Sequence, residues 1–182
     1  MKQLLTILIL LLVSLHSTAQ SDTVCYQSTS ATYQVINDPN NTYTWTVAAP
    51  GVVTTGQGTN LITVNWGTAN PGLIPNAVSV FPTNQYGCVG PTVLVDVFVL
   101  DLTPVAQPIG LCFTNPCTTL TATPTGGVWS GVGVSGDQFC PSVAGNGVST
   151  LTYTYSAGGC TFSTTTTATV SASPVISPIQ HD

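Results

Sequence analysis

The side chains best suited to chemistry in this chain are cysteines, because charged side chains are almost absent from it. Lys and Arg together occur once, as Lys2, Asp and Glu occur six times, all as Asp, and His occurs twice. In an exported chain, six cysteines are typical of disulfides rather than of free thiols or metal ligands. We therefore expect no metal site and no cofactor, and disulfides that use all six cysteines: Cys25, Cys88, Cys112, Cys117, Cys140 and Cys160.

The scarcity of charge also excludes whole classes of function. Lys2 belongs to a segment that we expect to be cleaved, so the mature chain has no Lys or Arg to neutralise phosphates, and nucleic acid is not an expected partner. The single histidine of the mature chain, His181, stands beside the last residue, which leaves no Ser-His-Asp arrangement. No two carboxylates stand in a context typical of glycoside hydrolysis. We expect a protein that is not an enzyme.

Residues 1–19 have the pattern of a secretory signal peptide. Lys2 supplies the positive start, an apolar run extends from Leu4 to Leu15, and the small residue Ala19 favours cleavage before Gln20. The run is too short to span a bilayer comfortably, and no later segment is apolar enough, so we expect no membrane span in the mature chain. A retained anchor is the alternative. The pattern predicts an exported, extracellular or cell-surface protein and leaves the periplasm open.

The elements that must hold these side chains are predicted to be β-strands throughout. Thr and Val favour the pleated surface, and the many prolines and glycines supply turns. In the first half, alternation places Trp45 inward. Asp96 is expected to face water, which turns four neighbours inward: Val93, Val95, Val97 and Val99. Strands at this spacing predict an Ig-like sandwich, with strands at 31–36, 42–47, 61–66, 77–81 and 92–100.

The second half repeats the pattern on a smaller scale. Trp129, which follows a Gly-Gly pair closely, is expected to enter the core. Pro104 and Pro108 mark a short, stiff connection between the halves. Strands are predicted at 120–124, at 128–131, around Phe139, at 149–156 and at 160–170. The predicted fold class is all-β, with two tandem Ig-like or PKD-like β-sandwiches after a cleaved signal peptide.

Short motifs in both halves resemble a known group of modules. In the first half they are YTWTV at 43–47, ITVNWG at 62–67 and NQYGCVG at 84–90. In the second they are GGVWSGVGV at 126–134 and TYTY at 152–155. These motifs resemble the PKD-like and Ig-like domains of Bacteroidota cell-surface proteins, which include gliding-motility-associated proteins and adhesins. With the strand pattern, this predicts four segments: a signal peptide at 1–19, a PKD/Ig-like sandwich at 20–101, an Ig-like sandwich at 102–172 and an extended tail at 173–182.

The resemblance also implies a pairing of the cysteines. The resembling domains tie their opening strand to the region before their last strand, which implies Cys25–Cys88 in the first half and Cys112–Cys160 in the second. The remaining pair is Cys117–Cys140, with one partner shortly before the strand 120–124 and the other directly after Phe139. Each of these disulfides lies within one half, so a crosslink between the halves would contradict the assignment.

Three further segments have two interpretations each. Asp22-Thr23-Val24 matches the pattern on which the resembling group attaches O-glycans, here at Thr23, or matches it by chance. Asp38-Pro39-Asn40-Asn41 is predicted to be a turn, with a calcium site of a single carboxylate as the alternative. Four aromatic residues either line a sugar-binding face together, or Trp66 packs in the core and the other three are scattered on the surface: Tyr26, Tyr33, Trp66 and Tyr86.

The C-terminal tail, 173–182, is not expected to belong to the second sandwich, because Pro174 and Pro178 interrupt ladder hydrogen bonds. Three of its residues are nevertheless too apolar for a purely solvated end: Val175, Ile176 and Ile179. Two interpretations stay open. The tail docks on a neighbouring protein by adding to a sheet edge or filling a groove, or it is a disordered end.

The chain is thus predicted to be a non-catalytic, secreted structural or adhesive surface module. A chain with so few charges gains stability from cores and crosslinks rather than ion pairs, and its strand edges suit packing against other proteins. The expected partners are other cell-envelope or surface-filament proteins, with self-association left open. A carbohydrate-binding module is the alternative function, with glycans as the partners.

Overall fold

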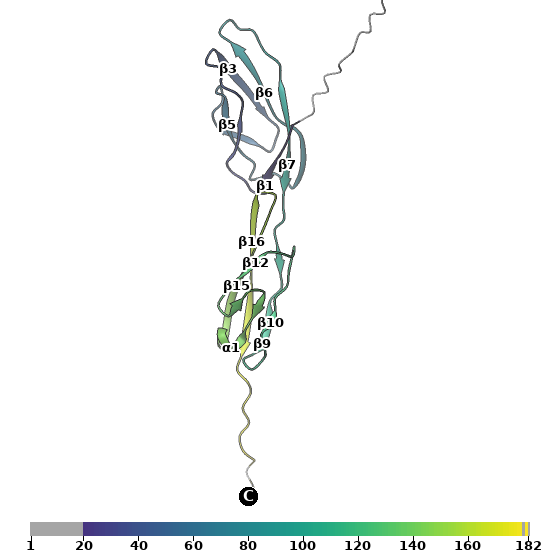
Figure 1. Cartoon of the computed structure of the whole chain (residues 1–182), viewed down its shortest axis with the longest axis vertical. Coiled ribbons are helices and arrows are strands. Elements are labelled where there is room, and N and C mark those ends of the chain that lie inside the picture. Colours follow the sequence, from purple (N-terminus) through teal and green to yellow (C-terminus); the bar gives the residue numbers. More distant parts are fainter. Residues whose placement is uncertain (1–19, 180, 182) are drawn as a thin grey trace, which may run out of the picture.

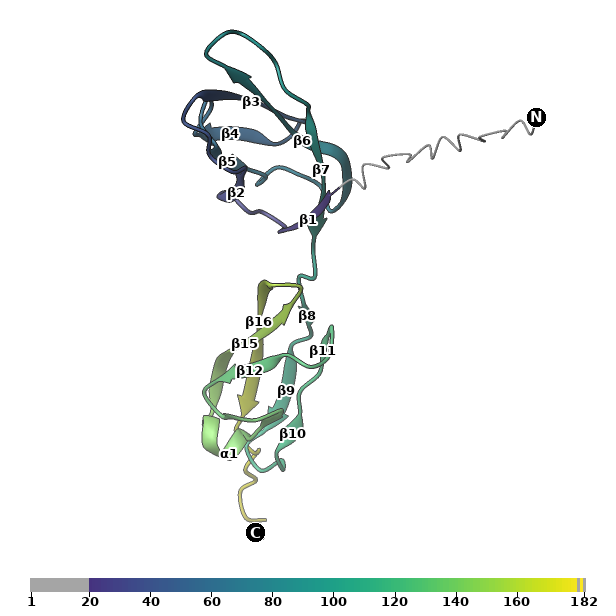
Figure 2. The same ribbon diagram turned by 45° about the horizontal axis from the view of Figure 1, so that its top comes forward.

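The computed structural model describes residues 20–179 and 181, and β-strands account for nearly all of its regular structure. Figures 1 and 2 show two groups of strands placed end to end along the long axis, with one extended segment leading from the first group to the second. We call them the N-terminal unit, 20–100, and the C-terminal unit, 105–171. The all-β prediction is confirmed, and the predicted signal peptide, 1–19, lies outside the described residues.

The N-terminal unit packs two sheets over one core. One sheet has the strand order β1-β7-β6-β3, and the other has the order β2-β5-β4. β6 is much longer than its predicted span of 77–81, and β4 is an additional strand. The strands are β1 Gln20–Cys25, β2 Ala31–Gln34, β3 Asn41–Val47, β4 Val52–Thr55, β5 Leu61–Asn65, β6 Gly72–Asn84 and β7 Val93–Leu100.

The core of the N-terminal unit forms because apolar side chains alternate along strands of both sheets. Trp45 on β3 is 5% exposed, which confirms its predicted burial, and Trp66 just after β5 is fully buried. The Trp66 Nε1 donates a hydrogen bond to the Tyr33 hydroxyl at 3.1 Å, so the polar atom of the indole has a partner within the core. The bond therefore holds together two aromatic side chains of the β2-β5-β4 sheet inside the core.

One predicted orientation on β7, that of Val93, is wrong. Val93 is 48% exposed, because β1 begins at Gln20 opposite Val95 and does not extend to Val93. Asp96 is only partly exposed, and its Oδ1 accepts a 2.7 Å hydrogen bond from the Asn76 N–H. This contact satisfies a backbone donor at the register shift between β6 and β7, where the ladder is interrupted.

The C-terminal unit is built around the long hairpin of β15 and β16. Its main sheet has the order β12-β15-β16-β9, beside smaller sheets of order β10-β14-β13 and β11-β8. The elements are β8 Val105–Ala106, β9 Ile109–Cys112, β10 Thr118–Thr119, β11 Ala122–Thr123, β12 Val128–Gly131, β13 Val134–Ser135, β14 Gln138–Phe139, α1 Pro141–Ala144, β15 Gly147–Ala157 and β16 Cys160–Ser171.

The core of the C-terminal unit is smaller. Trp129 is 6% exposed, as predicted, and its ring lies 4.9 Å from that of Tyr153, centroid to centroid. The predicted strand 120–124 is wrong, because the chain divides there into β10 and β11 around Leu120, whose N–H donates to the Asp137 carbonyl at 2.8 Å. Among the described residues the one α-helix is the four-residue α1, and no helix there could cross a bilayer.

The four-stranded sheets of the two units share one topological feature. In each, the strand that comes first in the sequence is paired in parallel with the strand that comes last. β1 lies parallel to β7, which places Cys25 opposite Leu100 at the junction of the units. β9 lies parallel to β16, which places Cys112 opposite Ser171 at the far end of the molecule. Parallel strands end at the same edge of a sheet, so this feature decides which cysteines can meet.

Candidate functional site

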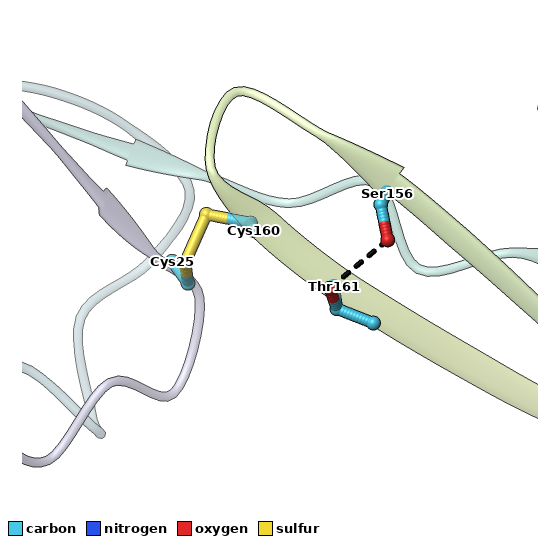
Figure 3. Close-up of a disulfide and its surroundings, with 4 residues drawn as sticks. All are labelled: Cys25, Ser156, Cys160 and Thr161. Carbon is cyan, nitrogen blue, oxygen red and sulfur yellow. Dashed lines mark hydrogen bonds between the residues drawn. A yellow bond between two sulfur atoms is a disulfide. The ribbon is translucent and has the colours of Figure 1, made fainter.

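A disulfide joins the two units at their junction. Cys25, the last residue of β1, is bonded to Cys160, the first residue of β16, with their Cα atoms 5.5 Å apart. Figure 3 shows the bond crossing from the end of β1 to the β15–β16 hairpin. Cys160 is only 2% exposed, so little of this residue is open to solvent. The units are therefore connected at two points, this disulfide and the backbone after β7.

The hairpin tip that carries the disulfide is shaped by two glycines. Gly158 and Gly159 connect β15 to β16 with φ angles of 59° and 78°, which suit a tight hairpin turn. A Cβ on Gly158 would lie 2.8 Å from Leu100 Cδ2, so a side chain there would displace the end of the Leu100 side chain. The Ser156 and Thr161 hydroxyls form a 2.9 Å hydrogen bond across the same hairpin (Figure 3). The Gly-Gly sequence thus allows contact between the units.

The backbone connection between the units is held by local hydrogen bonds. The Tyr26 N–H donates to the Leu100 carbonyl at 2.8 Å, directly beside the disulfide. The Asp101 Oδ1 accepts hydrogen bonds from the Thr103 N–H at 2.9 Å and from the Thr103 hydroxyl at 2.6 Å. Such an aspartate turn restricts the connecting segment, and Pro104 follows it at once. Hydrogen bonds therefore hold both connections between the units, the disulfide side at Tyr26 and the backbone segment after Leu100.

The predicted pairs Cys25–Cys88 and Cys112–Cys160 are wrong, and the parallel strands give the reason. Cys25 lies beside the last residue of β7, whereas Cys88 precedes the first residue of that strand. Cys112 lies beside the last residue of β16, whereas Cys160 is its first residue. In each unit a full strand length separates the two cysteines, and a disulfide needs Cα atoms within about 7 Å.

The predicted pair Cys117–Cys140 is confirmed, with Cα atoms 4.1 Å apart. It links the residue before β10 to the residue after β14, two strands that pair with each other. The other two cysteines, Cys88 and Cys112, are exposed and unpaired, so the expectation that all six form disulfides is wrong. The structure thus holds one disulfide within the C-terminal unit and one between the units.

A cavity of about 230 Å³ opens at the edge of the N-terminal unit between β1 and β2. Its lining includes Asp22, Tyr33 and Trp45. Burial first, and then the Asp22 carboxylate, raise the pKa of the Tyr33 hydroxyl to about 12, while the hydrogen bond from Trp66 opposes this shift. At ordinary pH this phenol is therefore a neutral hydrogen-bonding group, not an acid or a base.

The four aromatic residues proposed for a sugar-binding face do not come together. Trp66 is fully buried and Tyr33 is 8% exposed, so neither ring can present a face to a ligand. Tyr86 is 82% exposed but lies in the connection between β6 and β7, and Tyr26 is partly buried at the junction. Stacking on a sugar needs an exposed ring face. These residues form no common platform.

The described carboxylates mostly serve local backbone structure. Asp38 accepts hydrogen bonds from the Asn40 N–H at 2.9 Å and from the Asn41 side chain at 3.2 Å, which confirms the predicted turn. Asp96 and Asp101 accept the backbone hydrogen bonds described above. Within the part of the chain that the structure describes, no group of three or more His, Cys, Asp or Glu residues could hold a metal ion.

The two remaining predicted sites are accessible, and their roles stay predictions. Thr23 is an exposed residue of β1, so its hydroxyl is open to glycosylation. The tail forms no strand after β16 and leaves from the end of the molecule opposite the N-terminal unit (Figure 1). Three of its side chains are almost fully exposed, at 93%, 90% and 100%: Val175, Ile176 and Ile179.

Comparison with protein families finds a similarity that covers most of the N-terminal unit. Residues 13–95 match the model of the PKD-like domain family. No curated protein matches the chain. Two of the similar solved structures are human protocadherin-24 EC1-2 (11% identity, 85% of this chain and 95% of that chain, TM-score 0.34) and the fibronectin(III)-like modules of CbhA from Clostridium thermocellum (12% identity, 92% and 98%, TM-score 0.33).

The segment that matches the family model coincides with most of the N-terminal unit. The matched segment ends at Val95, so it contains β1 to β6 and only the first three residues of β7. The described chain consists of β-sheets with cores between them, and α1 is its single short helix. The N-terminal unit is thus similar to a PKD-like domain, in a chain whose described residues form an all-β fold.

Proposed function

We propose that the protein is an exported, non-catalytic structural or adhesive module that acts at the cell surface through contacts with other envelope or surface-filament proteins. The observation that carries this proposal is the disulfide between Cys25 and Cys160. It ties two β-sandwich units, already connected by backbone, into one extended body. A body of this kind can hold its two ends apart and resist pivoting under load, which is what a spacer or an adhesive subunit requires.

The compartment follows from the same chemistry. Disulfides form and persist in oxidising environments such as the cell exterior and the periplasm, and are rare in the cytosol. The described residues contain no Lys, Arg or Glu, so stability comes from cores and crosslinks, and proteases that cut after Lys or Arg find no site there. Both properties suit a protein that must persist outside the cell, on the surface or in the periplasm.

The tail supplies a contact element for this function. The tail exposes three apolar side chains beyond the C-terminal unit: Val175, Ile176 and Ile179. Their burial against a partner would remove apolar surface from water. Pro174 and Pro178 favour an extended chain, the conformation that adds to a sheet edge or fills a groove. The tail therefore docks on a neighbouring protein of the envelope or filament.

The test is immunolabelling of intact cells of the native organism, combined with purification of the protein from envelope fractions. We expect labelling outside the inner membrane and association with envelope proteins. Replacing the three apolar tail residues by Ser should reduce that association, while the control Val52→Ser, at an exposed strand position, should leave it unchanged. A protein confined to the cytosol, or one that binds no envelope protein, would contradict the proposal. Micromolar binding on a glycan array would favour the carbohydrate-binding alternative.

A further inference from the structure

Two exposed thiols, Cys88 and Cys112, remain after the disulfides are formed, and they lie at opposite ends of the molecule. β7 begins at Val93, a few residues after Cys88, and ends at the junction, and β16 begins at the junction and ends opposite Cys112. These strands have 8 and 12 residues. At about 3.3 Å per residue, the thiols stand on the order of 60 Å apart.

This separation means that the two thiols cannot bond to each other within one chain. A disulfide requires Cα atoms within about 7 Å, and the disulfide at the junction prevents the units from folding back on each other. Figures 1 and 2 agree that the units extend in line rather than side by side. Each thiol is therefore available only to another molecule.

The two thiols are presented by turns of the same construction. At the N-terminal end, the Cys88 N–H donates to Asn84 Oδ1 at 2.9 Å, and the Asn84 N–H donates to the Cys88 carbonyl at 3.0 Å. At the other end, the Cys112 N–H donates to Asn115 Oδ1 at 2.7 Å, and the Asn115 N–H donates to the Cys112 carbonyl at 2.9 Å. In both turns the cysteine backbone is fixed at two atoms while the residue stays exposed.

Exposed apolar side chains flank both thiols. Tyr86 is 82% and Val89 is 65% exposed beside Cys88, and Phe113 is 39% exposed beside Cys112. The apolar tail begins next to Cys112 as well, since the Phe113 N–H donates to the Ser171 carbonyl at 2.9 Å. If the Cys88 end of one molecule contacted the Cys112 end of another, the apolar side chains beside both thiols would be buried in one interface. No Lys, Arg or Glu would have to leave water.

We propose that this chain joins head to tail with further copies of itself, through a disulfide between Cys88 of one copy and Cys112 of the next. The inference rests on the proposed function as a surface module, and names the partner as a second copy. Contacts between unlike ends are heterologous, and in a straight body they do not close into a ring. The product is a linear covalent filament, with the apolar tail of each copy lying against the Tyr86 and Val89 end of its neighbour.

The bond forms by thiol–disulfide exchange with an oxidised dithiol of the export compartment, either a protein disulfide oxidoreductase or a small-molecule disulfide. One protein thiolate attacks a sulfur of the oxidant, which gives a mixed disulfide and releases one thiolate. The second protein thiolate, from the next copy, attacks the protein sulfur of this mixed disulfide and releases the other thiolate. In sum, two protein thiols are oxidised to one disulfide, and the oxidant disulfide is reduced to two thiols that take up the two protons.

The test uses the mature chain and its Cys88→Ser and Cys112→Ser variants, oxidised with glutathione disulfide and separated on non-reducing gels. The wild-type chain should form a ladder that collapses on reduction. Each variant alone should stay largely monomeric, whereas an equimolar mixture should yield dimers and nothing larger. Mass spectrometry of chymotryptic peptides should then find Cys88 linked to Cys112. A repeat in urea controls for pairing without the folded ends, and should produce like and unlike pairs together.

Three results would overturn the inference: a wild-type chain that stays monomeric, a mixture that forms no dimer, or single variants that dimerise as readily as their mixture. These results are separable from a failure of the proposed function. If the double variant Cys88→Ser/Cys112→Ser still reaches the surface and still associates with envelope proteins, the surface module stands and only self-assembly through these thiols is lost.

Discussion

The two units have related topology but different means of stabilisation. The N-terminal unit buries a cluster of thirteen residues around Trp45 and Trp66 and has no disulfide of its own. The cluster of the C-terminal unit has seven residues, and a disulfide between Cys117 and Cys140 lies beside it. A small unit buries proportionally less of its surface, so a crosslink there replaces part of what a larger core provides.

Two units with a similar sheet pattern can therefore differ in what stabilises their folded state. In the N-terminal unit we expect most of the free energy of unfolding to come from apolar burial in the larger core. In the C-terminal unit a substantial part comes from restricting the unfolded chain. The four predictions below test this contrast, beginning with the largest expected change in stability.

Replacing Trp66 by Ala should destabilise the N-terminal unit by about 3–5 kcal/mol, because it empties the deepest part of the core and removes the hydrogen bond to Tyr33. The loss should appear in chemical denaturation as an earlier transition of this unit alone. Trp66→Phe serves as the control and should cost less, since it retains most of the apolar volume. An unchanged melting temperature for Trp66→Ala would remove the basis of the comparison.

Replacing Cys117 and Cys140 together by Ser should destabilise the C-terminal unit by about 3 kcal/mol, the chain-entropy value for a loop closed across 23 positions. The transition of the N-terminal unit should not move. Cys88→Ser is the matched control, because it removes an exposed thiol that forms no bond. If the double variant keeps wild-type stability, the smaller core suffices and the proposed contrast between the units is wrong.

Stability of the N-terminal unit should fall as the pH rises from 10 to 12. Burial first, and then the Asp22 charge, raise the pKa of Tyr33 to about 12 from an ordinary value of 10. In this interval the unfolded chain loses the Tyr33 proton while the folded chain keeps it, so the contribution is complete below pH 10 and lost as pH passes 12. Tyr33→Phe should reduce this dependence, measured by thermal unfolding across the interval, and an equal slope in both proteins would contradict the assignment.

Replacing Cys25 and Cys160 together by Ser should change the stability of either unit least, because each keeps its own core. The expected effect is on the arrangement of the units. Small-angle X-ray scattering should show a broader range of interunit distances, since one of the two connections is removed. Gly158→Ala, which crowds Leu100 at the hairpin tip, is a milder perturbation of the same contact. Identical scattering from the double variant and the wild type would show that the backbone connection alone orients the units.

Much of the fold follows from alternation, because period-two burial is a local property of the chain. The strands β3, β5, β7, β12, β15 and β16 lie where the pattern predicts them. The turn at Asp38 and the turn at Asn84 are also local, because each aspartate or asparagine bonds to backbone a few residues away. The exposure of Val93 and the division of the strand 120–124 were not predictable in this way, since both depend on which other strands cover that part of the chain.

The order of residues was enough to predict a β-protein with little charge and with cores around Trp45 and Trp129, whereas the confirmed pair Cys117–Cys140 was expected only as the remainder of the pairing that the resemblance implies. Only the tertiary structure decided the partners of the other cysteines. Strand direction is set by long-range pairing and leaves no mark in a run of alternating residues. Because β1 runs parallel to β7, Cys25 meets Cys160 across the junction, and Cys88 and Cys112 are left free at the two ends of the molecule.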